Sequence, residues 1–97
     1  HAHMMGDVVD AIETCSGHVF TTHLHDNDGR RDDHRVPGAG GVDWDAALLA
    51  FQKVGYDGAW IFEVGATAPT RTVLERTARA RARFEELLGL NDEMLNP

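Results

Sequence analysis

The chain has 97 residues, 42% of them hydrophobic, and carries 16 acidic against 9 basic side chains, for a formal charge of -7. This hydrophobic content excludes a disordered chain, and the length has room for one domain but not for two. The negative charge opposes attraction to phosphate backbones, which disfavours a nucleic-acid partner and suits a small polar or cationic one.

The single cysteine and the absence of long apolar runs set the expected environment. Because Cys15 has no second cysteine to pair with, we expect a reducing, cytoplasmic setting, and we expect the thiol to be a small buried hydrophobe on a helix. No apolar run approaches the roughly 18 residues of a membrane span. We therefore expect a soluble protein without a membrane partner.

Residues 6–28 predict a helix followed by a strand. Gly17 stands where the helix would stop. Apolar residues recur at helical spacing before it, namely Val8, Val9, Ile12 and Cys15. Residues 18–28 are rich in β-branched and aromatic side chains and end in a polar cluster, which favours a strand. Period two places His23 and His25 on one face of this strand.

Residues 29–64 predict a loop, a second helix and a second strand. The glycines, proline and charges of residues 29–41 indicate a loop, and ordered loops of this length are often functional. Asp43 is expected to cap a helix that ends at Gly55. Its apolar stripe is Trp44, Ala47, Leu48, Phe51 and Val54. Residues 58–64 are expected to form the second strand. Glu63 and the residues that alternate with it lie on one face, the aromatic side chains lie on the other, and both faces are expected to be buried.

A longer helix is expected from Pro69 or Thr70, followed by a frayed tail over residues 91–97. Its inner side is expected to be Val73, Ala80, Phe84, Leu87 and Leu88. The order α-β-α-β-α indicates an α/β fold with parallel strands joined by right-handed helical crossovers. Parallel sheets are usually larger and covered on both faces, so two strands predict a missing partner or missing chain.

Imidazoles and carboxylates gather where the predicted strands end. The residues of this cluster are His23, His25, Asp26, Asp32, Asp33, His34 and Glu63. Sites in parallel α/β folds form at the carboxyl ends of strands, and mixed imidazole and carboxylate donors suit Zn²⁺, Mn²⁺, Co²⁺ or Fe²⁺. The alternative is a solvated polar loop. Glu63 is predicted to face an apolar interior, where a carboxylate needs a partner, although a strand-end residue reaching water is the alternative.

The string from His23 to Val64 resembles the closing part of the sugar phosphate isomerase/epimerase family, in the xylose-isomerase-like TIM-barrel superfamily. The shared motifs are H-L-x-D-N at a strand end, D-x-H in the next loop, P-G-x-G, D-W at a helix start, G-Y-D-G, and E-V at the end of the last strand. The opening HAHMMGD resembles the segment after the sixth strand, which favours native sequence over a cloning remnant for residues 1–4. The resemblance extends to about residue 90.

The resemblance implies that residues 1–97 are a single partial domain, the C-terminal part of a (β/α)8 barrel whose seventh and eighth strands are present. It makes His23 the seventh-strand metal ligand, with His25 in reserve for this role. Glu63 becomes the eighth-strand carboxylate that binds metal and transfers a proton.

Three further residues correspond to ligands that the family uses. His1 resembles the sixth-strand histidine that contacts substrate or a further metal and is a candidate catalytic residue. Asp32 and His34 match a D-x-H pair that holds additional metal in related abasic-site endonucleases, and many isomerase-like relatives retain that pair. The implied cofactor is a divalent metal, Mn, Zn, Co or Mg, whose number stays open.

The leading hypothesis is that the complete barrel isomerises or epimerises a sugar or sugar phosphate by proton transfer next to a carbonyl. One alternative is a metal-dependent phosphodiesterase of the abasic-site endonuclease kind. Another is an inactive fragment that self-associates as a homo-oligomer or binds the missing barrel portion through its residual apolar faces. The sequence does not identify the sugar.

Overall fold

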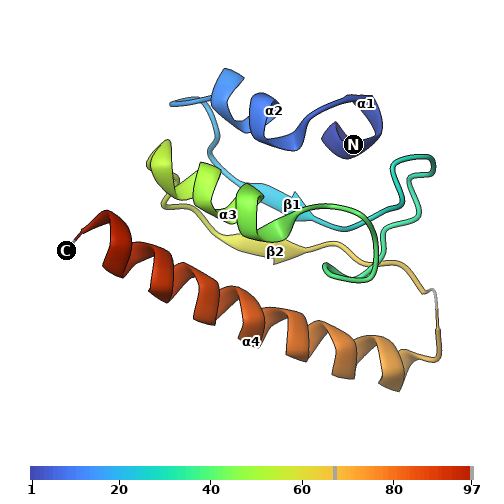
Figure 1. Cartoon of the computed structure of the whole chain (residues 1–97). Helices are drawn as coiled ribbons and strands as arrows, with labels where there is room; N and C mark the ends of the chain where they lie inside the picture. Colours follow the sequence, from blue (N-terminus) through green and yellow to red (C-terminus); the bar gives the residue numbers. More distant parts are fainter. Residues whose placement is uncertain (67, 97) are drawn as a thin grey trace.

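The computed structural model describes residues 1–66 and 68–96. It is a mixed α/β structure with two parallel strands, and Figure 1 shows its elements in chain order. These are α1 (Ala2–Met5), α2 (Val8–Thr14), β1 (Thr22–Leu24), α3 (Trp44–Lys53), β2 (Trp60–Phe62) and α4 (Thr70–Leu95). From α2 onward the elements follow the predicted alternation, and the short α1 is an addition to it.

The sheet consists of β1 and β2 paired in parallel, with His23 opposite Ile61. Both strands are shorter than residues 18–28 and 58–64, because each strand has a single neighbour to pair with. Beyond β1 the backbone of Asp26 pairs with Arg35 in an antiparallel bridge. This bridge ties the following loop back against the strand end.

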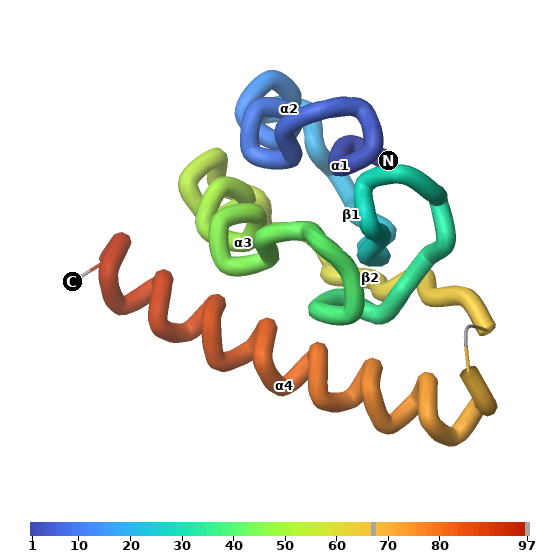
Figure 2. The backbone as a smooth tube through the Cα atoms, turned by 45° about the vertical axis from the view of Figure 1, so that its right-hand side comes forward, coloured from blue at the N-terminus to red at the C-terminus, as the bar shows by residue number. Residues whose placement is uncertain are grey.

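The hydrophobic core lies between one face of the sheet and the helices. Its buried residues are Ile12, Leu24, Ala47, Leu48, Ala50, Phe51, Phe84 and Leu87. Figure 2 shows α2, α3 and α4 arranged around the strands, with α3 between the other two helices. Leu24 faces this core, whereas its neighbour His23 is exposed.

The opposite face of the sheet has no cover among the described residues. Ile61 is 42% exposed, and Ala59 and Glu63 are exposed as well. The prediction that both faces of residues 58–64 are buried is therefore wrong for this chain. The side chains alternate as predicted, but no element of the described chain packs against the second face.

Local signals account for the boundaries of α3. The Asp43 carboxylate accepts a hydrogen bond from the Ala46 backbone N–H, which satisfies one of the free donors of the first turn. Gly55 follows the helix with a φ of 79°, a conformation that glycine adopts without strain. Both features confirm the predicted cap and stop.

The C-terminal helix α4 runs further than expected. It reaches Leu95, so the prediction of a frayed tail over residues 91–97 is wrong up to that residue, and Pro97 lies outside the described residues. Asn91 is buried, and its amide donates to Gln52 on α3, whose own amide donates to Asp92. This polar contact holds the last turns of α4 against α3.

The structure also bears on two other expectations, the burial of Cys15 and the lack of a membrane span. Cys15 is exposed rather than buried, because α2 ends at Thr14 and the thiol follows the last helical turn. None of the helices in the described part of the chain is both long enough and apolar enough to cross a bilayer.

Candidate metal centre

The structure brings six of the predicted site residues into one connected group at the carboxyl ends of β1 and β2, whereas Asp26 and Asp33 bond to other partners. Each member has its side chain close to that of another member. The group consists of His1, His23, His25, Asp32, His34 and Glu63. It has two halves, which are the His23–Glu63 pair and a set of imidazoles around Asp32.

The first half joins the two strands. His23 Nδ1 lies 2.9 Å from Glu63 Oε2, and the Glu63 N–H donates to the Leu24 carbonyl, which continues the strand pairing past β2. With the Nδ1 proton donated to the carboxylate, the lone pair of a neutral imidazole is at Nε2. A cation that displaced this proton would have both Nδ1 and the carboxylate as ligands.

The exposure of this pair differs from the prediction for Glu63. The side chains of His23 and Glu63 are 57% and 50% exposed, so the carboxylate reaches water instead of an apolar interior. The reason is the uncovered face of the sheet, on which both side chains lie.

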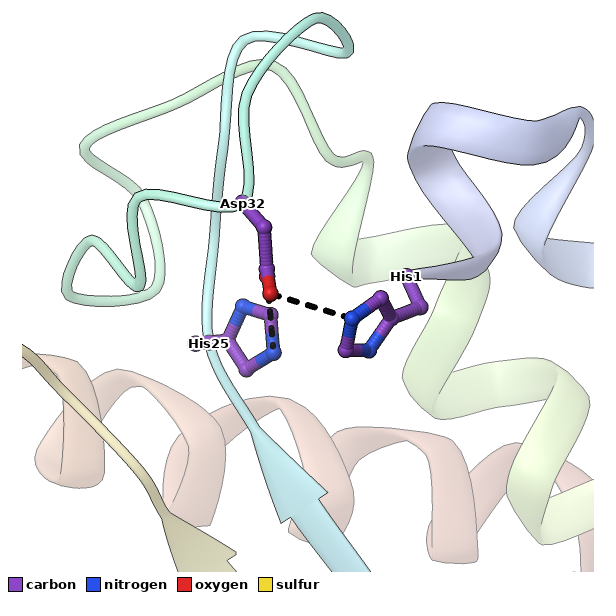
Figure 3. A group of neighbouring side chains, drawn as sticks. All are labelled: His1, His25 and Asp32. Atoms are coloured by element: carbon purple, nitrogen blue, oxygen red, sulfur yellow. Dashed lines mark ion pairs between the residues drawn. The ribbon is translucent and has the colours of Figure 1, made fainter.

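The second half surrounds Asp32, as Figure 3 shows for His1 and His25. His1 Nε2 lies 3.0 Å from Asp32 Oδ2, and His25 Nε2 lies 3.8 Å from Asp32 Oδ1. One ligand atom from each of these three residues falls within 4.8 Å of the others. Two imidazoles and a carboxylate at this spacing could surround one cation.

His34 connects the two halves. Its Nε2 lies 3.2 Å from Asp32 Oδ1, and its Nδ1 lies 3.2 Å from the Glu63 carbonyl and 3.6 Å from the Glu63 carboxylate. The His34 backbone has a φ of 48°, a conformation that is uncommon for residues other than glycine. Such strain gathers at functional sites, where the surrounding structure holds it in place.

His25 is the most enclosed imidazole of the group. Its side chain is 7% exposed and stacks on the His34 ring, with centroids 3.8 Å apart. Burial lowers the pKa of His25 below its ordinary value of 6.5, and the neighbouring His34 adds to this effect, while Asp32 and Glu63 oppose it. This shift favours the neutral ring, which can offer a lone pair.

A divalent metal fits these donors. The His25 Nδ1 atom is buried without a hydrogen-bond partner, and a buried polar atom without a partner calls for a specific explanation such as a bound ion. Imidazole and carboxylate donors without thiolate suit Zn²⁺, Mn²⁺ or Co²⁺. His25, predicted as the reserve for the role of His23, lies in the other half of the group and is far less exposed.

Asp26, which the sequence placed among the candidate metal ligands, is a structural anchor instead. It is fully buried, and its carboxylate accepts four hydrogen bonds at 2.8–3.0 Å. Its donors lie up to 18 residues away, and one of them is the indole N–H of Trp44, which the sequence placed in a purely apolar stripe. The signal in the sequence was the D-N after the strand together with the later P-G-x-G and D-W.

A cavity of about 250 Å³ lies beside the second half of the group, between α2, α3 and β1. His1, His3, His23 and His25 contribute to its wall, and the remaining lining is largely apolar. Such a wall offers few partners for hydroxyl groups. The cavity therefore does not by itself supply a sugar-binding surface.

Comparison with known proteins identifies the family. The family model described as xylose isomerase-like TIM barrel matches residues 1–87. The chain is 35% identical over 87 residues to the uncharacterized protein y4fM of Sinorhizobium fredii (strain NBRC 101917 / NGR234), which covers 84% of this chain and 27% of that relative. No solved structure gives a significant match. The chain belongs to the xylose isomerase-like TIM barrel family.

Proposed function

We propose that the complete protein is a metal-dependent sugar or sugar phosphate isomerase or epimerase, and that this chain contributes one side of its active site. The observation that carries the proposal is the 2.9 Å contact between His23 and Glu63 on neighbouring parallel strands. In this family fold, residues at the carboxyl ends of strands serve catalysis. The chain spans 27% of its relative, so the activity is assigned to the complete protein.

His23 and Glu63 would hold the principal cation between them, His23 through Nδ1 and Glu63 through its carboxylate, in place of the proton that these two groups share in the metal-free chain. When bound, a divalent ion supplies an electrophile that stabilises negative charge on the carbonyl and hydroxyl oxygens of the substrate. The His25 lone pair and the Asp32 carboxylate are the donors for a further cation, with His1 beside them.

Glu63 is the proton-transfer group of this side. Its carboxylate is half exposed on the open face of the sheet, where a substrate carbon could approach it. His23 engages Oε2, which leaves Oε1 as the oxygen that receives the proton from the carbon next to the carbonyl. The second acid or base of an isomerisation would come from the remainder of the barrel.

The second candidate is a metal-dependent phosphodiesterase of the abasic-site endonuclease kind. The observation that favours it is the separate set of His1, His25 and Asp32, because sites that hold two or more metals are typical of phosphodiester cleavage. The formal charge of -7 opposes binding to nucleic acid. Because of this charge, we prefer the isomerase hypothesis.

Solvent exchange in the complete protein tests the leading proposal. The purified protein is supplied with Mn²⁺, Co²⁺, Zn²⁺ or Mg²⁺ and a panel of aldoses, ketoses and their phosphates in D2O, and deuterium at the carbon next to the carbonyl is measured by NMR. We expect exchange that Glu63→Gln abolishes. Glu75→Gln is the matched control, because Glu75 is an exposed carboxylate on α4 away from the site.

Two results would count against the isomerase. Exchange that persists in Glu63→Gln would remove Glu63 from the proton-transfer step. Metal-dependent cleavage of a phosphodiester probe, without deuterium incorporation into any sugar, would favour the phosphodiesterase instead.

A further inference from the structure

We infer that Asp26 is the positioning residue that holds the loop bearing Asp32 and His34 over the end of β1. This inference rests on the proposed metal site for its function. It is carried by geometry that does not depend on which metal or substrate is bound. Asp26 follows His25 directly and is 0% exposed.

The Asp26 carboxylate gathers both ends of the loop. Oδ1 accepts from the backbone N–H groups of Asn27 at 2.8 Å and Val42 at 3.0 Å. Oδ2 accepts from the Gly38 N–H at 2.9 Å and from the Trp44 indole at 2.8 Å. One side chain thus joins the start of the loop, its turn, its end and the first residue of α3.

The backbone of Asp26 fixes the middle of the same loop. Its N–H donates to the Arg35 carbonyl at 2.7 Å, and its own carbonyl accepts from the Arg35 N–H at 2.8 Å. Arg35 follows His34, so this bridge is one residue away from the strained φ of 48°. The anchor therefore holds the His34 ring where it stacks on His25 and faces Asp32.

The anchor requires a carboxylate and a glycine next to it. All four partners of the side chain are N–H donors, so an amide at position 26 would place its own NH₂ group against two of them. A Cβ atom at Gly40 would lie 2.5 Å from Asp26 Oδ1 and would overlap the Asn27 carbonyl. Because the Asn side chain has nearly the shape of Asp, Asp26→Asn keeps the packing and reverses only the hydrogen bonding at one oxygen.

The test compares Asp26→Asn with the wild-type chain, first without metal. NMR of the imidazole protons should show the contact between the His25 and His34 rings in the wild type. In Asp26→Asn, measured well below its melting temperature, we expect that contact to be lost while the His23 signals stay in place. A merely structural role would lower the melting temperature and leave the ring contact intact in the folded chain.

The second readout is Zn²⁺ affinity, which we expect to weaken by about 10–100-fold, as for residues that orient metal ligands. Asp45→Asn, an exposed aspartate in the first turn of α3, is the charge-matched control and should change neither readout. A retained ring contact in folded Asp26→Asn, or a lost contact with unchanged Zn²⁺ affinity, overturns the inference.

Failure of the proposed function gives a different result. A wild-type chain that binds no Zn²⁺ contradicts the metal site, whereas the ring contact still decides the role of Asp26. If Asp26→Asn does not fold, Trp44→Phe removes one of the four donors and should weaken the ring contact partially. An unchanged contact in Trp44→Phe would then overturn the inference.

Discussion

The His23–Glu63 pair should contribute little to stability and much to metal binding. The two side chains are 57% and 50% exposed, and exposed ion pairs stabilise proteins by about 0–1 kcal/mol. Glu63→Gln also keeps an oxygen that can accept from His23, as well as the backbone contacts of Glu63 to Leu24 and His34. We therefore expect its free energy of unfolding to fall by less than about 1 kcal/mol, or about 8 °C in melting temperature at most.

Metal affinity should respond differently to the same substitution. Removing an outer partner of a metal ligand commonly weakens binding by about 10–100-fold, so the loss of a direct carboxylate ligand should cost at least as much. The assay pairs urea denaturation of the metal-free chain with a competition titration against a chelating dye for Zn²⁺ or Co²⁺. Glu85→Gln is the matched control, because Glu85 forms an exposed pair with Arg81 at 3.0 Å, on a helix away from the site.

Two results would contradict these roles of the His23–Glu63 pair. A fall in unfolding free energy of more than about 2 kcal/mol, well above the range for exposed pairs, would make the pair a structural contact. Unchanged metal affinity in Glu63→Gln, relative to the Glu85→Gln control, would remove Glu63 from the ligand set.

Three further predictions address the core, the loop and the open face of the sheet. Leu48→Ala at a fully buried position should lower the unfolding free energy in urea by about 3–5 kcal/mol, and a loss under about 1 kcal/mol would contradict the described core. The Arg30 backbone N–H lowers the pKa of Asp28 below its ordinary 3.8. The stabilisation by Asp28 should therefore be present above pH 3.8 and be lost as pH falls through the folded pKa. An NMR titration midpoint of Asp28 at or above 3.8 would contradict this. If the open face drives self-association, Ile61→Lys should reduce the mass measured by light scattering, and an unchanged oligomer would place the contact elsewhere.

Local signals in the sequence predicted the helices better than the strands. Asp43 and Gly55 bracket α3 because a cap and a left-handed stop act within one turn of the residue itself. The end of α4 could not be predicted in this way, because Asn91 is held by Gln52 from another helix. Strand lengths likewise depend on the number of neighbours, which the sequence does not state.

In the candidate site too, some features follow from the local sequence and others depend on contacts made only in the folded chain. Period two and parallel pairing are enough to bring His23 and Glu63 together at the ends of adjacent strands. The role of Asp26 depends on donors at positions that only the folded loop brings close. Half exposure of Glu63 was the alternative prediction, and it holds because none of the described residues covers the open face of the sheet.

Anomalous X-ray scattering would show whether a divalent ion binds between His23 and Glu63. Crystals of the chain grown with Zn²⁺ would be measured at the zinc absorption edge. We predict an anomalous peak about 2.0–2.2 Å from a ring nitrogen of His23 and from a carboxylate oxygen of Glu63. Peaks confined to other surface residues, such as the exposed His18, or no peak at all, would contradict the assignment of this group as a metal centre.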